Sequence, residues 1–367
     1  MKQFNSIKLL VCICLFVGVH TNAQINTPNA SPKAKVSQRI GISDVTIKYS
    51  RPSVNDRPVW GNLVPYGMNN LGFGTSTAAP WRAGADENTT ITFSHDAKVE
   101  GKEIKAGTYG LHIEVKPNDK ATLILSHDAN AWGSFFYDQS KDALRAEITT
   151  TTVPHHELLT FEFNEVTSNS AIATLAWEKK GFPLNVSFDV TPIVLNDWRA
   201  KAKGQAGFQR QNWEQAANFA LNNGGNLTEA LGWIDSAIAG QFFSQKTFNN
   251  LQIKAQILDK LGKTNEATAV MDEALPLATI FQVHQYGRTL ITKGQLDKAL
   301  EVFSMNAEKN KDTWPVHYGL ARAYSAKGEY KVALKHLRKA LVNAPNEASK
   351  GRVQANIDKL EKNEDIN

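Results

Sequence analysis

Hydrophobic and polar residues alternate along the first half of the chain with a period of two, which is typical of half-buried β-strands. Turn signals such as Lys116-Pro117-Asn118-Asp119 and Lys180-Gly181-Phe182-Pro183 separate these segments. Tight connections favour antiparallel pairing, so residues 33–195 are predicted to form an all-β antiparallel sandwich or a flattened barrel. The predicted strands are 34–40, 44–50, 89–93, 109–116, 121–126, 144–150, 158–164, 171–178 and 184–190.

One long segment interrupts the strand pattern. Residues 51–79 contain too many prolines and glycines for regular structure, but Val59-Trp60 and Leu63-Val64 are too apolar for a disordered chain. We therefore expect an ordered loop across one end of the sheets. The side chains that this loop should bring beside Trp81 and Arg82 are Arg51, Arg57, Trp60 and Tyr66.

After Trp198 the hydrophobic period changes to 3.6, which indicates amphipathic helices. Candidate turn glycines recur at spacings of 37, 32 and 34 residues, at Gly225, Gly262, Gly294 and Gly328. Residues 211–363 are therefore predicted to form four helix pairs and a C-terminal capping helix, after a linker at 196–210. The helix pairs should begin near Gln211, Phe248, Ile280 and Trp314.

The last helix pair resembles a tetratricopeptide repeat over residues 314–347, with Leu320, Ala321, Tyr324, Gly328 and Ala333 at the expected positions. The resemblance implies an all-α solenoid in which each helix pair buries its apolar face on the next pair. It also implies a scaffold that binds a protein or peptide along the first helices. The predicted groove residues are Gln252, Gln256, Lys260, His284, Arg288, Tyr318 and Arg322.

Arg288 and Arg322 lie 34 residues apart and should occupy equivalent positions in neighbouring repeats. Two aligned guanidinium groups suit an acidic peptide or a chain terminus. The alternative is a solvated concave face, or one that the chain itself fills.

Seven motifs occur in order along the first half: 50–53 (SRPS), 63–67 (LVPYG), 81–85 (WRAGA), 87–90 (ENTT), 106–109 (AGTY), Trp132-Gly133 and His156-Glu157. Over about residues 33–190 they resemble a bacterial family known as domain of unknown function 2911. The family's usual spacing joins the second motif almost directly to the third, whereas this chain inserts residues 68–80 between them. The resemblance implies an exported protein and brings no established reaction.

Arginine and aromatic residues in this half suggest a binding site. Guanidinium groups bind carboxylates or phosphates, and exposed rings stack on sugars, so the predicted ligand is a glycan, a peptide or an anionic small molecule. The candidate ligand-binding residues are Arg51, Arg57, Trp60, Tyr66, Trp81, Arg82 and Arg145. The competing interpretation is a salt-bridge network that pins the loop.

The alternative to a non-catalytic binding protein is a hydrolase-type enzyme. Glu87 and Glu157 would be its acid and base, because paired carboxylates with separated pKa values perform such chemistry.

Other chemistry finds no support in the composition. The two cysteines, Cys12 and Cys14, fall in the N-terminal leader, so the mature chain is expected to have no disulfide and no thiolate zinc site. The histidines lack metal-binding spacing, and we expect no metal and no cofactor. The net charge of +5 is mild and no basic stripe is present, which makes nucleic acid an unexpected partner.

The N-terminus has the pattern of a secretory signal peptide. Lys2 and Lys8 precede an apolar run from Leu9 to Val19, and small or polar residues end at Ala23, where we place cleavage. That run is shorter than the roughly 20 residues that a membrane-spanning helix needs. We therefore predict a leader at 1–23, a linker at 24–32, and export to the periplasm or the medium as a scaffold of the cell envelope.

Overall fold

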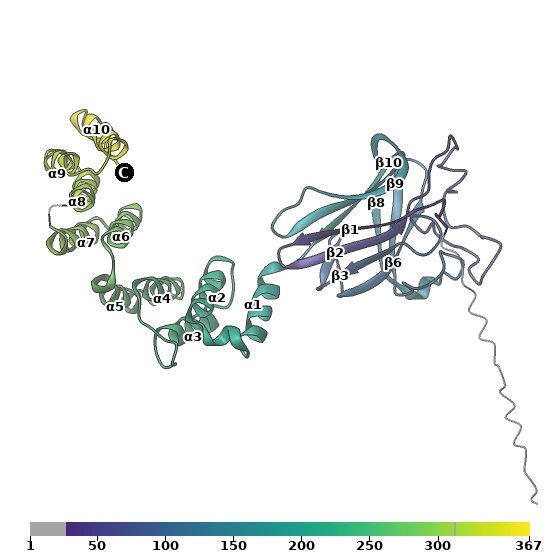
Figure 1. Cartoon of the computed structure of the whole chain (residues 1–367), viewed down its shortest axis with the longest axis horizontal. Helices are drawn as coiled ribbons and strands as arrows, with labels where there is room; N and C mark the ends of the chain where they lie inside the picture. Colours follow the sequence, from purple (N-terminus) through teal and green to yellow (C-terminus); the bar gives the residue numbers. More distant parts are fainter. Residues whose placement is uncertain (1–26, 312) are drawn as a thin grey trace, which may run out of the picture. The chain divides into compact units, whose positions relative to one another are not determined.

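The computed structural model describes residues 27–311 and 313–367. The chain divides into two compact units between Asp189 and Val190 (Figure 1). The first unit is built from antiparallel strands and the second from helices, which confirms the predicted fold class. The predicted signal peptide at 1–23 lies outside the described residues.

Within residues 27–189, the β unit, ten strands form two separate sheets. The six-stranded sheet has the order β1-β2-β3-β6-β7-β8, the four-stranded sheet has the order β5-β4-β10-β9, and all paired neighbours are antiparallel. The strands are β1 (Lys33–Ile40), β2 (Ser43–Ser50), β3 (Thr90–Phe93), β4 (Ala97–Val99), β5 (Lys102–Ile104), β6 (Gly107–Val115), β7 (Lys120–Ser126), β8 (Asp142–Thr149), β9 (Thr151–Asn164) and β10 (Ser170–Ser187).

Side chains from both sheets meet in one apolar core. The Tyr49 ring on β2 packs edge-on against Phe161 on β9, with ring centroids 4.9 Å apart, and the Phe161 amide donates to the Tyr49 hydroxyl. Alternate residues of β2 are buried, as expected when one face of a sheet covers a core, whereas β6 is buried continuously from Tyr109 to Ile113. Of the two predicted arrangements, the pair of separate sheets is the one observed.

The strand prediction was wrong at one turn and missed two short strands. Residues 180–183 were expected to be a turn, but they lie inside β10, where Gly181 pairs with Thr151. Pro183 is accommodated because it falls after the last β9 pairing and before the β4 pairing at Val186. The strands β4 and β5 are three residues each, too short for a periodic signal.

The long loop after β2 is ordered and is attached to the sheets at several points. Isolated bridges join Ser53 to Leu158 and Trp81 to Ile113, and the Gly67 amide donates to the Val115 carbonyl at 2.7 Å. The insertion at 68–80 closes on itself through a bridge between Asn69 and Ala79. The loop thus brings residues from 53 to 82 onto β6 and β9.

The helical unit contains four helix pairs and a final helix α10 (Glu347–Glu361). The pairs begin at Arg210, Phe248, Ile280 and Trp314, within one residue of the expected starts. Residues 196–210, predicted to be a linker, instead include the second half of α1 and a short 3-10 helix at Gln205–Phe208. The remaining helices are α1 (Val190–Lys201), α2 (Arg210–Asn222), α3 (Leu227–Ile238), α4 (Phe248–Lys260), α5 (Thr264–Ala274), α6 (Ile280–Thr292), α7 (Leu296–Lys309), α8 (Trp314–Ala326) and α9 (Tyr330–Val342).

Phe303 on α7 illustrates how neighbouring repeats interlock. Its ring is completely buried between Gly287 on α6 and Gly319 on α8, and a Cβ added at either glycine would collide with the ring. Each helix pair therefore depends on the next for burial of its apolar face. Within the described residues, no helix is long and apolar enough to cross a membrane.

Candidate functional site

The first helices of the third and fourth repeats bring four predicted groove residues together. The imidazole of His284 on α6 stacks on the ring of Tyr318 on α8, with centroids 5.9 Å apart and planes 11° apart. The Arg322 guanidinium lies over the Tyr318 ring, 5.0 Å from its centroid. Arg288 is exposed, and no hydrogen bond or ion pair holds its guanidinium among the residues that the structure describes.

The charge of this cluster comes from its arginines alone. Burial, followed by the positive charge of Arg322 and that of Arg288, lowers the pKa of His284 to about 4. The imidazole is therefore neutral at neutral pH and serves as an aromatic surface. A ligand at this position meets two guanidinium groups and two flat rings.

Arg322 differs from its counterpart Arg288 because the chain itself contacts it. One terminal nitrogen donates to the Ile366 carbonyl at 3.1 Å and to Oδ1 of Asn367 at 3.3 Å. The other terminal nitrogen donates to the Tyr318 hydroxyl, whereas the buried Nε has no acceptor in the part of the chain that the structure describes. The fourth repeat thus shows the self-filled groove that was one of the two alternatives, with Ser325 and Ile366 as participants that the sequence did not indicate.

The second repeat contributes less of the predicted groove. Gln252 and Gln256 line a small hollow of about 180 Å³, together with Tyr286 and Lys293. Lys260 instead donates to the Leu221 carbonyl at 2.7 Å, near the C-terminal end of α2. A cation is favourable at a helix C-terminus, so Lys260 has a structural role.

In the β unit, three of the predicted ligand-binding residues line one hollow of about 520 Å³: Arg57, Trp81 and Arg82. The Arg82 guanidinium donates to the Asp86 carbonyl at 2.7 Å and lies 5.1 Å from the Phe135 ring centroid. Burial lowers the pKa of Arg82, although the nearby Asp86 charge acts in the opposite direction. Trp132, which also lines the hollow, is 55% exposed and offers a ring to a ligand.

Most other predicted residues of this set hold the loop in place. Trp60 packs edge-on against Trp81 and Trp177, with centroids 5.7 and 5.9 Å away, and so belongs to the core. Arg51 donates to the Leu159 carbonyl and to the Thr160 hydroxyl, and Arg57 donates to the carbonyls of Ser53 and Val54. Tyr66 is 44% exposed.

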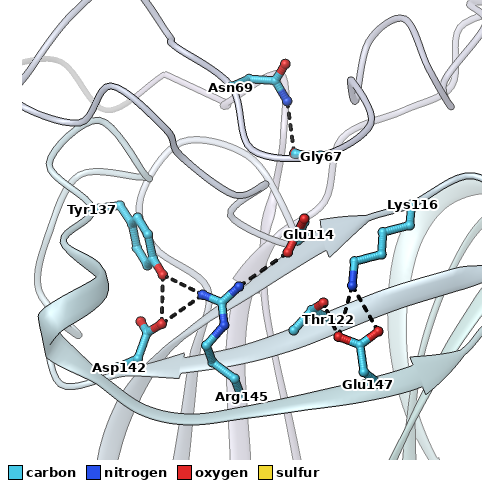
Figure 2. Close-up of polar contacts among 9 residues, drawn as sticks. All are labelled: Gly67, Asn69, Glu114, Lys116, Thr122, Tyr137, Asp142, Arg145 and Glu147. Carbon is cyan, nitrogen blue, oxygen red and sulfur yellow. Dashed lines mark hydrogen bonds and ion pairs between the residues drawn. The ribbon is translucent and has the colours of Figure 1, made fainter.

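Arg145 lies in a separate polar network on β6 and β8 (Figure 2). Its guanidinium donates to Asp142 at 2.9 Å, to the Tyr137 hydroxyl at 3.0 Å and to Glu114 at 3.3 Å. Burial and the adjacent Asp142 raise the pKa of Tyr137 well above its ordinary value. Arg145 is therefore engaged in the kind of structural network that the competing interpretation expects.

Glu87 and Glu157 do not form an acid–base pair with separated pKa values. A hydrogen bond from Lys33 at 2.6 Å lowers the pKa of Glu87, and a hydrogen bond from the Asn55 amide at 2.9 Å lowers that of Glu157. Both carboxylates are ionised at neutral pH, so neither holds the proton that an acid catalyst needs. No group of metal-ligating side chains occurs in the described part of the chain.

Comparison with known protein families gives a different match for each of the two units. Residues 31–186 match the model of a family described as a protein of unknown function (DUF2911), and residues 314–347 match the tetratricopeptide repeat model, which confirms both resemblances. No curated protein matches the chain.

Solved tetratricopeptide proteins are similar at low identity. YrrB, a TPR protein with an unusual peptide-binding site, is 18% identical, with 45% of this chain and 84% of that chain covered and a TM-score of 0.30. The C-terminal part of a TPR protein from Cytophaga hutchinsonii is 17% identical (47% and 67% covered, TM-score 0.35), and a TPR protein from Parabacteroides merdae is 16% identical (48% and 74% covered, TM-score 0.32). The chain thus combines a region that matches a family of unknown function with a tetratricopeptide repeat region.

Proposed function

We propose that the chain is an exported, non-catalytic scaffold of the cell envelope whose solenoid binds an acidic segment of a partner protein. The observation that carries this proposal is the cluster of His284, Arg288, Tyr318 and Arg322 on neighbouring first helices, with Arg288 exposed and without an acceptor among the described residues. A guanidinium forms two parallel hydrogen bonds with a carboxylate, and flat rings beside it accept apolar side chains. The tetratricopeptide match supports a protein-interaction scaffold independently of these residues.

Affinity capture from an envelope extract, followed by calorimetry with the captured protein, tests this proposal. The immobilised mature chain is compared with Arg288→Ala and with Arg352→Ala, an exposed arginine on α10 that also has no acceptor among the described residues and serves as the matched control. Loss of a charged hydrogen bond costs about 1.5–3 kcal/mol, so Arg288→Ala should weaken binding about 10- to 100-fold. A partner whose affinity is the same for both variants would refute the role of this face.

We further propose that the hollow of the β unit binds an anionic or sugar ligand. The partly buried Arg82 beside the exposed Trp132 supports this, because a desolvated guanidinium gains from a carboxylate and an exposed indole stacks on a sugar ring. Left-handed Ala83 and Asp86, with φ of 50° and 57°, shape the same loop, and such strain concentrates at binding sites.

Tryptophan fluorescence during titration with glucuronate, glucose and acetate tests the β-unit proposal. Glucuronate combines a ring with a carboxylate and should bind better than either of the other probes. Trp132→Ala should abolish the response and leave the far-UV circular dichroism unchanged. If no probe changes the fluorescence of the wild type at millimolar concentration, this site is not of the proposed kind.

Export is supported by the basic start and the apolar run before Ala23. Mass spectrometry of the protein recovered from the producing cell should give a chain that begins at Gln24. A chain that retains residues 1–23 would contradict the proposal.

A further inference from the structure

Residues 363–367 turn back from α10 and lie against α8. Asn363 adopts a left-handed conformation with φ of 60°, which reverses the chain direction after the helix. The Ile366 side chain is then 5% exposed and packs in an apolar cluster with Ala321, Ile357 and Leu360. An otherwise polar segment thus places one branched aliphatic side chain in a socket between two helices.

Side chains of α8 also bind the backbone of this segment. The Ser325 hydroxyl donates to Oδ1 of Asp365 at 2.6 Å and accepts from the Ile366 amide at 3.2 Å. Arg322 donates to the Ile366 carbonyl, and the Asn367 side chain donates to the Arg322 carbonyl. A groove recognises an extended peptide in this way, because polar side chains hold its backbone and a socket selects one side chain.

Asp365 contributes as a charged group. Burial acts to raise its pKa, but hydrogen bonds from Ser325, Asn367 and backbone amides outweigh burial and lower it. The carboxylate is therefore ionised at neutral pH, and its interaction with Ser325 is a charge-assisted hydrogen bond.

The segment leaves part of this surface unsatisfied. The hydrogen bonds that Arg322 donates to the segment go to neutral oxygens, and its buried Nε has no acceptor among the described residues. Arg288, at the equivalent position of the preceding repeat, is also without an acceptor in the described chain. A carboxylate accepts from two guanidinium nitrogens at once, so an acidic side chain fits this place better than Asn367 does.

We propose that residues 365–367 are an internal competitor for the partner segment, and that the partner carries an acidic residue, a branched aliphatic residue and then a further acidic residue. The first two positions reproduce the contacts of Asp365 and Ile366, and the third supplies the carboxylate that Arg322 and Arg288 lack. The inference rests on the proposed function of the groove. The fourth repeat stays closed until a partner displaces residues 365–367. The apparent affinity for the partner therefore equals the intrinsic affinity multiplied by the fraction of molecules in which the repeat is open.

The test uses a fluorescein-labelled peptide, Gly-Glu-Asp-Ile-Glu-Glu-Gly, and the full mature chain. Fluorescence anisotropy gives the affinity for the wild type, for Ile366→Ala, which weakens the internal segment, and for Val342→Ala, an exposed control on α9. Ile366→Ala should bind the peptide at least tenfold more tightly than the wild type, and Val342→Ala should bind as the wild type does. A peptide with serine in place of isoleucine should lose binding to all three.

Hydrogen exchange in the wild type gives a second measurement that needs no variant. The Ile366 amide should exchange slowly in the free chain and quickly when the peptide is bound. Equal affinity for the wild type and Ile366→Ala, or an Ile366 amide that stays protected with peptide bound, would overturn the competition. If the peptide does not bind to a folded Ile366→Ala variant, the proposed sequence of the partner segment is wrong. The scaffold proposal would still stand in that case if the capture experiment finds a partner whose binding is lost in Arg288→Ala.

Discussion

Replacement of Arg145 by methionine tests whether the arginines of the β unit hold its structure together or stay free for a ligand. Arg145 contacts Asp142 and Glu114 and the hydroxyl of Tyr137 (Figure 2). Methionine keeps the apolar part of the side chain and removes the charge. The Asp142 side chain is only 7% exposed. Its Oδ2 accepts from Arg145 and from the Tyr137 hydroxyl, and its Oδ1 has no partner among the described residues, so the substitution leaves a buried carboxylate without a cation.

The expected cost follows from this burial. Removal of one partner from a buried ion pair costs about 3–5 kcal/mol. Arg145 itself is 30% exposed and solvent screens part of the interaction, so we expect about 2–4 kcal/mol for Arg145→Met. Arg39→Met is the matched control, because Arg39 pairs with Asp44 in the same unit at the same distance of 2.8–2.9 Å but is mostly exposed. An exposed pair of this kind contributes less than about 1 kcal/mol.

Native-state hydrogen exchange in β7 and β8 is the appropriate assay, since it reports the β unit without interference from the helices. Exchange of the protected amides should become about 30- to 1000-fold faster in Arg145→Met and less than about tenfold faster in Arg39→Met. If both variants exchange within threefold of the wild type, the network contributes nothing to stability and Arg145 is available to a ligand after all.

Two further predictions concern packing and pH. In urea unfolding followed at 222 nm, Phe303→Ala should lower the free energy of unfolding by about 3–5 kcal/mol, and Gly319→Ala by about 1–3 kcal/mol. The double variant should lose less than the sum of the two single losses, because both changes act on one contact. Additive losses would contradict that contact. Burial, and secondarily Arg82, lowers the pKa of His112 to about 4 from 6.5. The neutral imidazole therefore contributes stability that is present above pH 6.5 and is lost, by roughly 3 kcal/mol, as the pH falls towards 4. In His112→Gln, exchange in β6 should depend less on pH over this range, and an unchanged pH dependence would refute the assignment.

The solenoid was largely predictable because its structure is local. The spacing of Gly262, Gly294 and Gly328 marks turns between paired helices, and the helix starts follow from the 3.6-residue period. Residues 196–210 carry no repeat pattern, and they are partly helical, with Trp198 buried among α2 residues.

The β unit was predicted less completely because its pairings are not local. The continuation of β10 through Gly181 and Phe182 depends on Thr151, which is 30 residues away. The seven predicted ligand-binding residues were expected to meet in one place, but Arg51 and Arg145 find acceptors on different strands, and of the seven only Arg57, Trp81 and Arg82 line the hollow. The spacing of residues along the sequence shows which polar side chains a segment contains. It does not show which hydrogen-bond acceptor each side chain will meet in the folded chain.

The two arginines of the groove show why the solenoid is the stronger candidate for the binding function. Arg288 and Arg322 occupy equivalent repeat positions, yet Arg322 is contacted by a segment 44 residues further along the chain and Arg288 is not. A charged group contributes to binding only if its hydrogen-bonding capacity is free or is released on binding. In the β unit Arg51, Arg57 and Arg145 are already bonded within the fold, so a ligand there would have to replace existing contacts. In the solenoid the Arg288 guanidinium has no acceptor within residues 27–311 and 313–367, and that of Arg322 is held by neutral oxygens, which an acidic partner replaces with a stronger interaction.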